Sequence, residues 1–209
     1  MDIWSDGMIT RVPAILVALT VHELAHGAAA RALGDDTAER AGRLTLNPLA
    51  HLDLFGTLML LYGPFGWAKP VPVDPRKLRN PRWDMALVAV AGPLSNIALA
   101  AATGLLYRLD LVNYGSVASA FLSVFFLINI GLAVFNLLPI HPLDGSRILV
   151  AFLSEKNLRR YAKVMAVAPI VFLGMICAEW VLNKPILSYF LEPVFRPAFH
   201  LAKTLFIGP

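Results

Sequence analysis

The sequence predicts an α-helical polytopic membrane protein with four to six transmembrane helices and a re-entrant, β-hairpin-like segment between the first two. Hydrophobic residues make up 57% of the 209-residue chain, only 15% is charged, and the mean hydropathy is +0.65. This is more apolar side chain than one soluble core needs. Several runs of about 20 residues carry few charges, as bilayer-spanning helices do. A stretch rich in Pro and Gly, yet apolar, separates the first two runs.

We expect a single membrane domain over residues 1–209, because no polar block is long enough to form a separate soluble domain. The runs long enough to span a bilayer are residues 8–33, 84–107, 116–138 and 161–182. Residues 186–207 contain two prolines and predict an amphipathic or kinked helix. Its polar face would hold Glu192, Arg196, His200 and Lys203. We interpret His200 as part of this solvated face rather than as a ligand.

Residues 42–74 form the unusual region between the first two spans. Its ends, "GRLTLNP" and "FGWAKPVPVDP", resemble short strands bounded by turn residues. Its apolar middle is too short to cross a bilayer, so it begins and ends on the same side. Irregular backbone at membrane depth requires cover from protein or from a wet cavity. We therefore expect a re-entrant hairpin beside a cavity, with an interfacial loop on the lipid headgroups as the alternative.

The basic residues predict the orientation in the membrane. With an external N-terminus, 13 of the 18 Lys and Arg residues lie in internal loops, as the positive-inside rule requires. The net charge of +4 is thus a signal for topology and lipid contact, and no nucleic-acid motif accompanies it. The single cysteine, Cys177, excludes a disulfide framework. We expect a multi-pass protein of a prokaryotic cell membrane.

The first span contains the motif "HELAH", which is unusual for a lipid-facing helix. His22 and His26 share one helical face and can bind one metal ion, while Glu23 points beside it, near a bound water. An ionisable group inside a span costs roughly 2.5 to 3.5 kcal/mol and normally persists for function. A polar contact between helices is the alternative. A rise of 1.5 Å per residue places the histidines roughly 7 to 13 Å below the inner surface.

Two imidazoles do not complete a catalytic zinc site, which uses three protein ligands and an open position for water. The candidate third ligand is Asp144, within residues 139–149, where Pro139, Pro142 and Gly145 end the third span. That span and the first both end inside, so the three ligands can meet. Zinc makes water a nucleophile at neutral pH. Glu23 would accept its proton and pass it to the leaving amine.

Four stretches together suggest a family: "HELAHG", "AGPLSN" (Ala91–Asn96), "NLLPIHPLDGSRIL" (Asn136–Leu149) and "FGWAKPVPVDP". They resemble the site-2 protease family of intramembrane zinc metalloproteases, in a minimal form without PDZ or CBS domain. The resemblance implies one Zn²⁺ per chain, bound by His22, His26 and Asp144, with Glu23 as catalytic base. It also implies that Asn136 helps to hold the oxyanion, although a helix-end amide bonded to local backbone is the alternative. Ser146 replaces the second glycine of the common "LDGG".

The resemblance implies hydrolysis of a peptide bond within the transmembrane helix of a substrate, which must first unwind locally. We expect residues 44–46 to offer a strand edge to the unwound substrate, through Leu44, Thr45 and Leu46. His51 is either a substrate contact or a structural polar group. The expected partners are a transmembrane protein substrate, the lipid bilayer and a regulatory membrane protein, with no nucleic acid.

Other polar residues near these motifs have simpler interpretations. Asn96 is expected to form hydrogen bonds between helices, and His141 to be a loop residue rather than a fourth ligand. The alternative to a protease is a membrane metal-binding or metal-transport protein that uses the same three ligands. A transporter needs ligands across the whole bilayer, whereas the four spans hold almost no other ionisable residues. It would not need Glu23 either.

Overall fold

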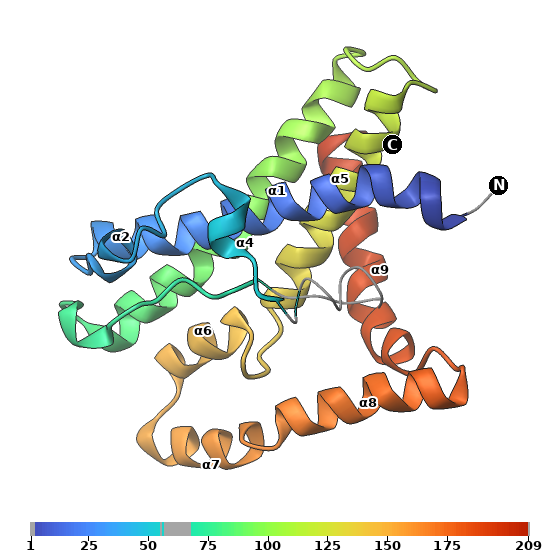
Figure 1. Ribbon diagram of the computed structural model, residues 1–209. Coiled ribbons are helices and arrows are strands. Elements are labelled where there is room, and N and C mark those ends of the chain that lie inside the picture. The colour runs from blue at the N-terminus through green and yellow to red at the C-terminus, as the bar shows by residue number, and fades with distance from the viewer. Residues whose placement is uncertain (1–2, 55, 57–67, 209) are drawn as a thin grey trace.

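A computed structural model of the chain, shown in Figure 1, describes residues 3–54, 56 and 68–208. Every regular element in these residues is a helix. Four helical stretches are long and apolar enough to cross a membrane: Ile9–Ala32, Pro81–Arg108, Val117–Asn136 and Glu155–Glu179. They match the four predicted spans, so the helical class is confirmed.

The helices α1 (Ile3–Ala32), α4 (Pro81–Arg108) and α5 (Val117–Asn136) form the centre of the structure. Each of them contacts the other two, and Figure 1 shows α1 crossing both of its neighbours. Small residues lie at these crossings: Ala18 of α1 is fully buried in a cluster with Phe125 of α5. Small side chains allow helices to approach closely. The polar groups of three different helices can therefore reach one another.

The last helix, α9 (Ile186–Phe206), packs against α4 and α5 and continues through both of its prolines. Its Ala202 is buried together with Ala100 of α4 and Ile130 of α5. The opposite face is exposed and carries the expected polar residues, namely Glu192, Arg196, His200 and Lys203. The helix thus has one face on the bundle and one polar face directed away from it.

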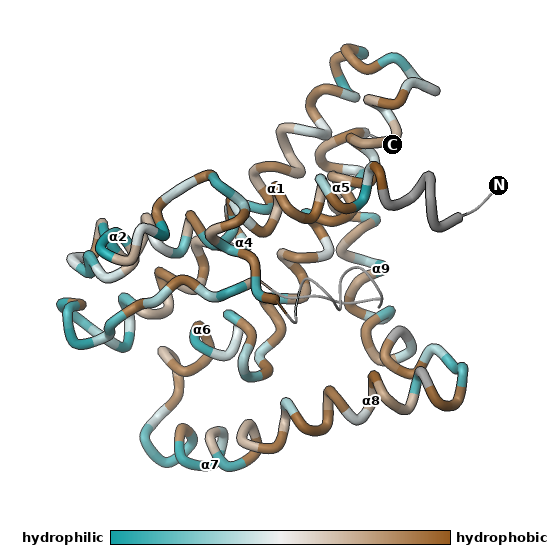
Figure 2. Tube along the Cα trace, viewed as in Figure 1, coloured by the Kyte–Doolittle hydropathy of each residue, from teal (hydrophilic) through white to brown (hydrophobic). Residues whose placement is uncertain are grey.

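Two helices extend away from the central bundle (Figure 1): α7 (Glu155–Met165) and α8 (Ala168–Leu182). Figure 2 shows that α8 is hydrophobic along its length, whereas α7 carries hydrophilic residues. None of the most apolar 18-residue window of this stretch is buried inside the protein. Apolar surface of this extent is typical of lipid contact.

The segment between α1 and α4 contains three short helices in its described part: α2 (Thr37–Arg40), η1 (Pro48–His51) and η2 (Pro75–Lys77). Leu52 and Ala68 form an isolated antiparallel bridge, which brings the two flanks of the predicted re-entrant segment together. Residues 57–67, its apolar middle, lie outside the described residues. The re-entrant hairpin therefore stays a prediction.

The short strands predicted at the two ends of this segment are wrong for the described residues. Residues 44–46 form bends, and residues 69–74 form no ladder. Local hydrogen bonds explain the first difference, because the Asn47 amide donates to the Thr45 hydroxyl oxygen and the Asn47 side chain accepts from the amide of Leu49. Such side-chain bonds compete with strand pairing. At the other end, the alternating prolines Pro70 and Pro72 have no amide hydrogen for a ladder.

Candidate metal centre

The three predicted metal ligands meet at one point inside the helix bundle. The Nε2 atoms of His22 and His26 are 3.0 Å apart on one face of α1. Each lies 3.2 Å from Oδ2 of Asp144, the first residue of α6 (Asp144–Phe152). One ligand atom from each of the three residues lies within 4.8 Å of the others. All three side chains are buried.

A close approach between the start of α6 and the residues just after α5 places Asp144 at this point. A Cβ atom on Gly145 would lie only 2.2 Å from the carbonyl oxygen of Leu137, just beyond the end of α5. Only glycine allows this contact. Ser146 is buried, and its hydroxyl donates to the Leu143 carbonyl at 2.6 Å. The serine that replaces the expected second glycine is therefore accommodated by the turn.

The second nitrogen of each imidazole is held by another helix. Nδ1 of His26 lies 2.7 Å from the backbone carbonyl of Val88, and Nδ1 of His22 lies 2.7 Å from Oδ1 of Asn96. Both oxygens are acceptors, so each ring carries its hydrogen on Nδ1 and directs a lone pair from Nε2 toward Asp144. Histidines that bind metals are usually oriented in this way. Asn96 forms the expected interhelical hydrogen bond, and its partner is one of the candidate ligands.

Gly92 of α4 provides the space in which the two imidazoles lie. A Cβ atom at this position would be 2.4 Å from Nε2 of His26 and 2.6 Å from Cε1 of His22. Real Cβ atoms essentially never approach other atoms this closely. The absence of a side chain at Gly92 is thus a condition for the observed positions of both rings. The motif "AGPLSN" therefore shapes the site with Gly92 as well as with Asn96.

The three candidate ligand atoms fit a zinc ion. Oδ2 of Asp144 is buried and has no hydrogen-bond donor, and the two Nε2 lone pairs that face it are acceptors as well. Three acceptors directed at one buried point are unfavourable unless a cation lies among them. Two imidazoles and one carboxylate are a ligand set of catalytic zinc sites. Tetrahedral zinc with bonds near 2.0 to 2.1 Å separates its ligand atoms by about 3.3 Å, close to the 3.0 to 3.2 Å found here.

Glu23 is held by the backbone near the C-terminal end of the region 42–74. Its Oε2 accepts a hydrogen bond of 2.8 Å from the amide of Val71. Val71 also lies near Gly27, where a Cβ atom would be 3.2 Å from the valine side chain. The stretch around Val71 thus lies directly on the polar face of α1. This contact is not predictable from the sequence, because a backbone amide donor has no residue-type signature.

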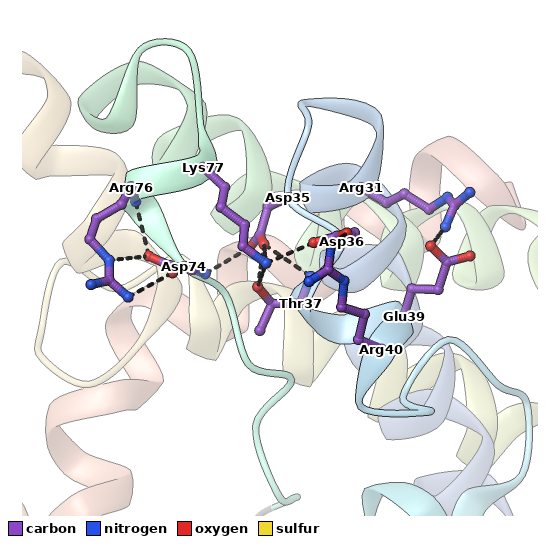
Figure 3. Close-up of polar contacts among 9 residues, drawn as sticks. All are labelled: Arg31, Asp35, Asp36, Thr37, Glu39, Arg40, Asp74, Arg76 and Lys77. Carbon is purple, nitrogen blue, oxygen red and sulfur yellow. Dashed lines mark hydrogen bonds and ion pairs between the residues drawn. The ribbon is translucent and has the colours of Figure 1, made fainter.

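A cluster of charged and polar side chains, shown in Figure 3, holds this stretch in place. Asp35, just after α1, is fully buried and accepts hydrogen bonds from the Thr37 amide at 3.0 Å and from the Asp74 amide at 2.7 Å. Nζ of Lys77 lies 3.8 Å from Asp35 and 2.7 Å from Asp36. Burial by itself would raise the pKa of the Asp35 carboxyl, but a hydrogen bond from the Thr37 hydroxyl, the two amide donors and the ammonium group outweigh it and hold that pKa below its usual value.

The other predicted site residues lie outside the group of three. Nδ2 of Asn136 donates to the carbonyl of Leu132 in its own helix, at 3.0 Å. His141 is exposed in the loop before Asp144, as expected for a loop residue. The role of Asn136 in holding an oxyanion stays a prediction. Its present partner is the local backbone contact considered as the alternative.

The residues predicted to contact substrate have different environments. Leu44 packs against α1 at Gly27, where an added Cβ atom would lie 2.6 Å from the leucine side chain. The backbone carbonyl of Thr45 accepts a hydrogen bond of 2.9 Å from Nε2 of His51. His51 is buried, and its Nδ1 has no hydrogen-bond partner. Leu46 is 67% exposed. Of the four, Leu46 is the side chain most open to another molecule.

Two comparisons with known proteins find relatives. Residues 107–177 match the family model described as "Peptidase family M50". Over 187 residues the chain is 39% identical to "Putative zinc metalloprotease YwhC" of Bacillus subtilis (strain 168), covering 86% of this chain and 83% of the relative. No solved structure matches the chain. The chain belongs to peptidase family M50, the site-2 protease family of zinc metalloproteases.

Proposed function

We propose that this protein is an intramembrane zinc endopeptidase that hydrolyses peptide bonds within transmembrane segments of other membrane proteins. One observation carries the proposal: two imidazoles and a carboxylate converge, buried, between helices long and apolar enough to span a membrane. Membership in a family of zinc metalloproteases supports the hydrolytic chemistry. The position within the helices favours a substrate that is itself in the membrane.

His22, His26 and Asp144 would hold one zinc ion per chain, which leaves a fourth position open. When bound, zinc activates water as a nucleophile and polarises the carbonyl of the scissile bond. The protein contributes the fixed directions of the ligand atoms. The oxygens of Val88 and Asn96 prevent either imidazole from rotating.

Glu23 would act as the general base, because it is the carboxylate next to the ligand His22 on α1. It accepts a proton from the attacking water and later gives it to the leaving amine. The Val71 amide, at 2.8 Å, binds Oε2 and leaves Oε1 for this proton. Asn136 would stabilise the oxyanion with the amide hydrogen that is not donated to the Leu132 carbonyl.

We propose that the substrate approaches over Leu44, Thr45, Leu46 and His51, with Leu46 as the first side chain that it meets. The exposure of Leu46 supports this order, and the burial of His51 favours a structural role for that residue. A regulatory membrane protein and the surrounding lipid would be the other partners. By the distribution of basic residues, the N-terminus is external and the active site lies near the cytoplasmic side of the cell membrane.

Glu23→Gln is the test of this function. The variant keeps all three ligands, so it should bind zinc like the wild type but lose hydrolysis. Wild type and variant are expressed with a panel of tagged single-span membrane proteins, and membrane fragments are compared by mass spectrometry. Glu192→Gln is the matched control, because Glu192 is exposed on α9 and pairs with Arg196. Equal fragment formation by wild type and Glu23→Gln would contradict the role of Glu23.

The alternative is a metal transporter that uses the same three ligands. Among the described residues, these three form the one group of His, Cys, Asp or Glu able to hold a metal ion, so no second station along a path is visible there. The alternative predicts zinc movement across sealed vesicles that depends on Asp144 but not on Glu23. That result, together with no cleavage of any panel member, would favour transport.

A further inference from the structure

Two buried amide side chains, those of Asn129 and Asn96, form a relay of hydrogen bonds from α5 to His22. Asn129 of α5 and Asn96 of α4 are both fully buried, and Nδ2 of Asn96 donates to Oδ1 of Asn129 at 2.9 Å. Nδ2 of Asn129 donates to the carbonyl of Phe125 at 2.9 Å. Nδ2 of Asn96 also donates to the carbonyl of Ala18 in α1, at 3.2 Å. Oδ1 of Asn96 lies 2.7 Å from Nδ1 of His22.

The two backbone carbonyls fix the direction of every hydrogen bond in this relay. A carbonyl can only accept, so the Phe125 carbonyl requires the NH₂ group of Asn129 and turns its Oδ1 toward Asn96. That oxygen and the Ala18 carbonyl are two acceptors, and together they require the NH₂ group of Asn96. The remaining atom of Asn96, its Oδ1, must then face His22. Rotation of either amide by 180° would place two acceptors or two donors against each other in a buried site.

The relay therefore determines which ring nitrogen of His22 carries a hydrogen. An acceptor at Nδ1 requires the hydrogen there and leaves the Nε2 lone pair free for a ligand bond. If Asn96 presented its NH₂ group instead, Nδ1 would be the acceptor and Nε2 would carry the hydrogen. That tautomer cannot bind a metal through Nε2. The Ala18 carbonyl belongs to α1 itself, one turn before His22, so the helix that carries His22 also fixes the orientation of the Asn96 amide.

We propose that Asn96 and Asn129 are positioning residues for the zinc site: Asn96 sets the tautomer and ring orientation of His22, and Asn129 acts through Asn96. The inference rests on the proposed zinc binding by His22, His26 and Asp144. It goes beyond that proposal because neither asparagine touches the metal or the substrate. Nδ1 of His26 is bound by the Val88 carbonyl instead, so the relay acts on His22 alone of the two imidazoles.

The test measures zinc affinity of the full-length protein in detergent by competition with a chelator. Removal of the hydrogen-bonding group that orients a metal-binding histidine typically lowers metal affinity roughly 10- to 100-fold. We expect a loss of this size for Asn96→Leu and a smaller loss for Asn129→Leu. Because Asn129 acts through Asn96, the double variant should bind zinc about as weakly as Asn96→Leu alone. Cobalt(II) in place of zinc gives a visible spectrum that reports the ligand geometry, and it should change in all three variants.

Thr103→Val is the matched control. Thr103 is also a buried polar residue of α4, but its hydroxyl donates to the carbonyl of Leu99 in the same helix, away from the site. The change should leave zinc affinity and the cobalt spectrum unaltered. Thermal unfolding of the metal-free variants shows whether each protein is folded. If Asn96→Leu does not fold, Asn129→Leu still tests the relay, since Asn129 contacts none of the three ligands in any of its bonds above.

The possible results separate the relay from the site that it serves. If the wild type binds no zinc, or if Asp144→Ala binds zinc as well as the wild type, the proposed site fails. If the wild type binds zinc through Asp144 and both asparagine variants match it, the relay fails. Losses that add in the double variant would also contradict the relay, because they would mean independent effects on packing.

Discussion

Gly92→Ala is the smallest change that tests the geometry of the metal centre. The added Cβ would lie 2.4 Å from Nε2 of His26, whereas ordinary contacts begin at 3.4 Å. The atoms must therefore separate by about 1 Å. Gly92 is inside α4, and Ala89, Pro93 and Asn96 close to it are buried, so we expect the imidazoles rather than the helix to give way. Metal–ligand bonds tolerate only about 0.2 Å.

The expected result is weaker zinc binding and a loss of hydrolysis of about 100-fold, the usual scale for a displacement of about 1 Å at a reacting centre. Zinc affinity is measured by chelator competition and hydrolysis by release of fragments from a tagged single-span protein. Gly174→Ala in α8 is the control, because a Cβ there would meet nothing within 4 Å. Wild-type affinity and hydrolysis in Gly92→Ala would refute the argument that Gly92 makes room for the histidines.

Three further predictions concern the surroundings of the site. Val71→Pro removes the amide that binds Glu23 and should reduce hydrolysis while zinc stays bound; Val71→Ala keeps the amide, and equal losses in both would point to side-chain packing instead. Asp144→Ala should abolish zinc binding, so chelator should lower the melting temperature of the wild type by several degrees but leave that of the variant unchanged. Because the folded-state pKa of Asp35 is lowered, its carboxylate adds stability above its unfolded pKa of about 3.9, and this contribution is lost as the pH falls through the folded pKa. Thermal unfolding between pH 7 and pH 3 should show a shallower acid decline for Asp35→Asn, and an unchanged slope would contradict this account of Asp35.

The features that the sequence predicted well depend on short spacings. Helical periodicity places His22 and His26 on one face whatever the rest of the fold does, and apolar length identifies the spans. Asp144 was identifiable because the prolines and glycine around it end a helix at a position where a carboxylate has no local role. Each of these signals lies within a few residues, and the common inner end of the first and third spans then predicts that Asp144 can reach the histidines.

The features that the sequence did not reveal depend on contacts between distant segments. The hydrogen bond between His22 and Asn96 joins residues 74 positions apart, and that between Glu23 and Val71 joins residues 48 apart. Gly92 looks like any small residue of a packed helix until the rings beside it are placed. The strand prediction at residues 44–46 was wrong because alternation of side chains carries no information about the bonds that Thr45 and Asn47 make locally.

The candidate ligands are widely separated along the chain, since His26 and Asp144 are 118 positions apart. During synthesis α1 is made long before α6, so the nascent protein carries the histidines and Glu23 without the third candidate ligand. A ribosome must extend the chain past residue 144, and α4 and α5 must be in place, before the centre can be completed. Under the proposed function, a newly made molecule would stay inactive toward neighbouring membrane proteins until its own helices have assembled.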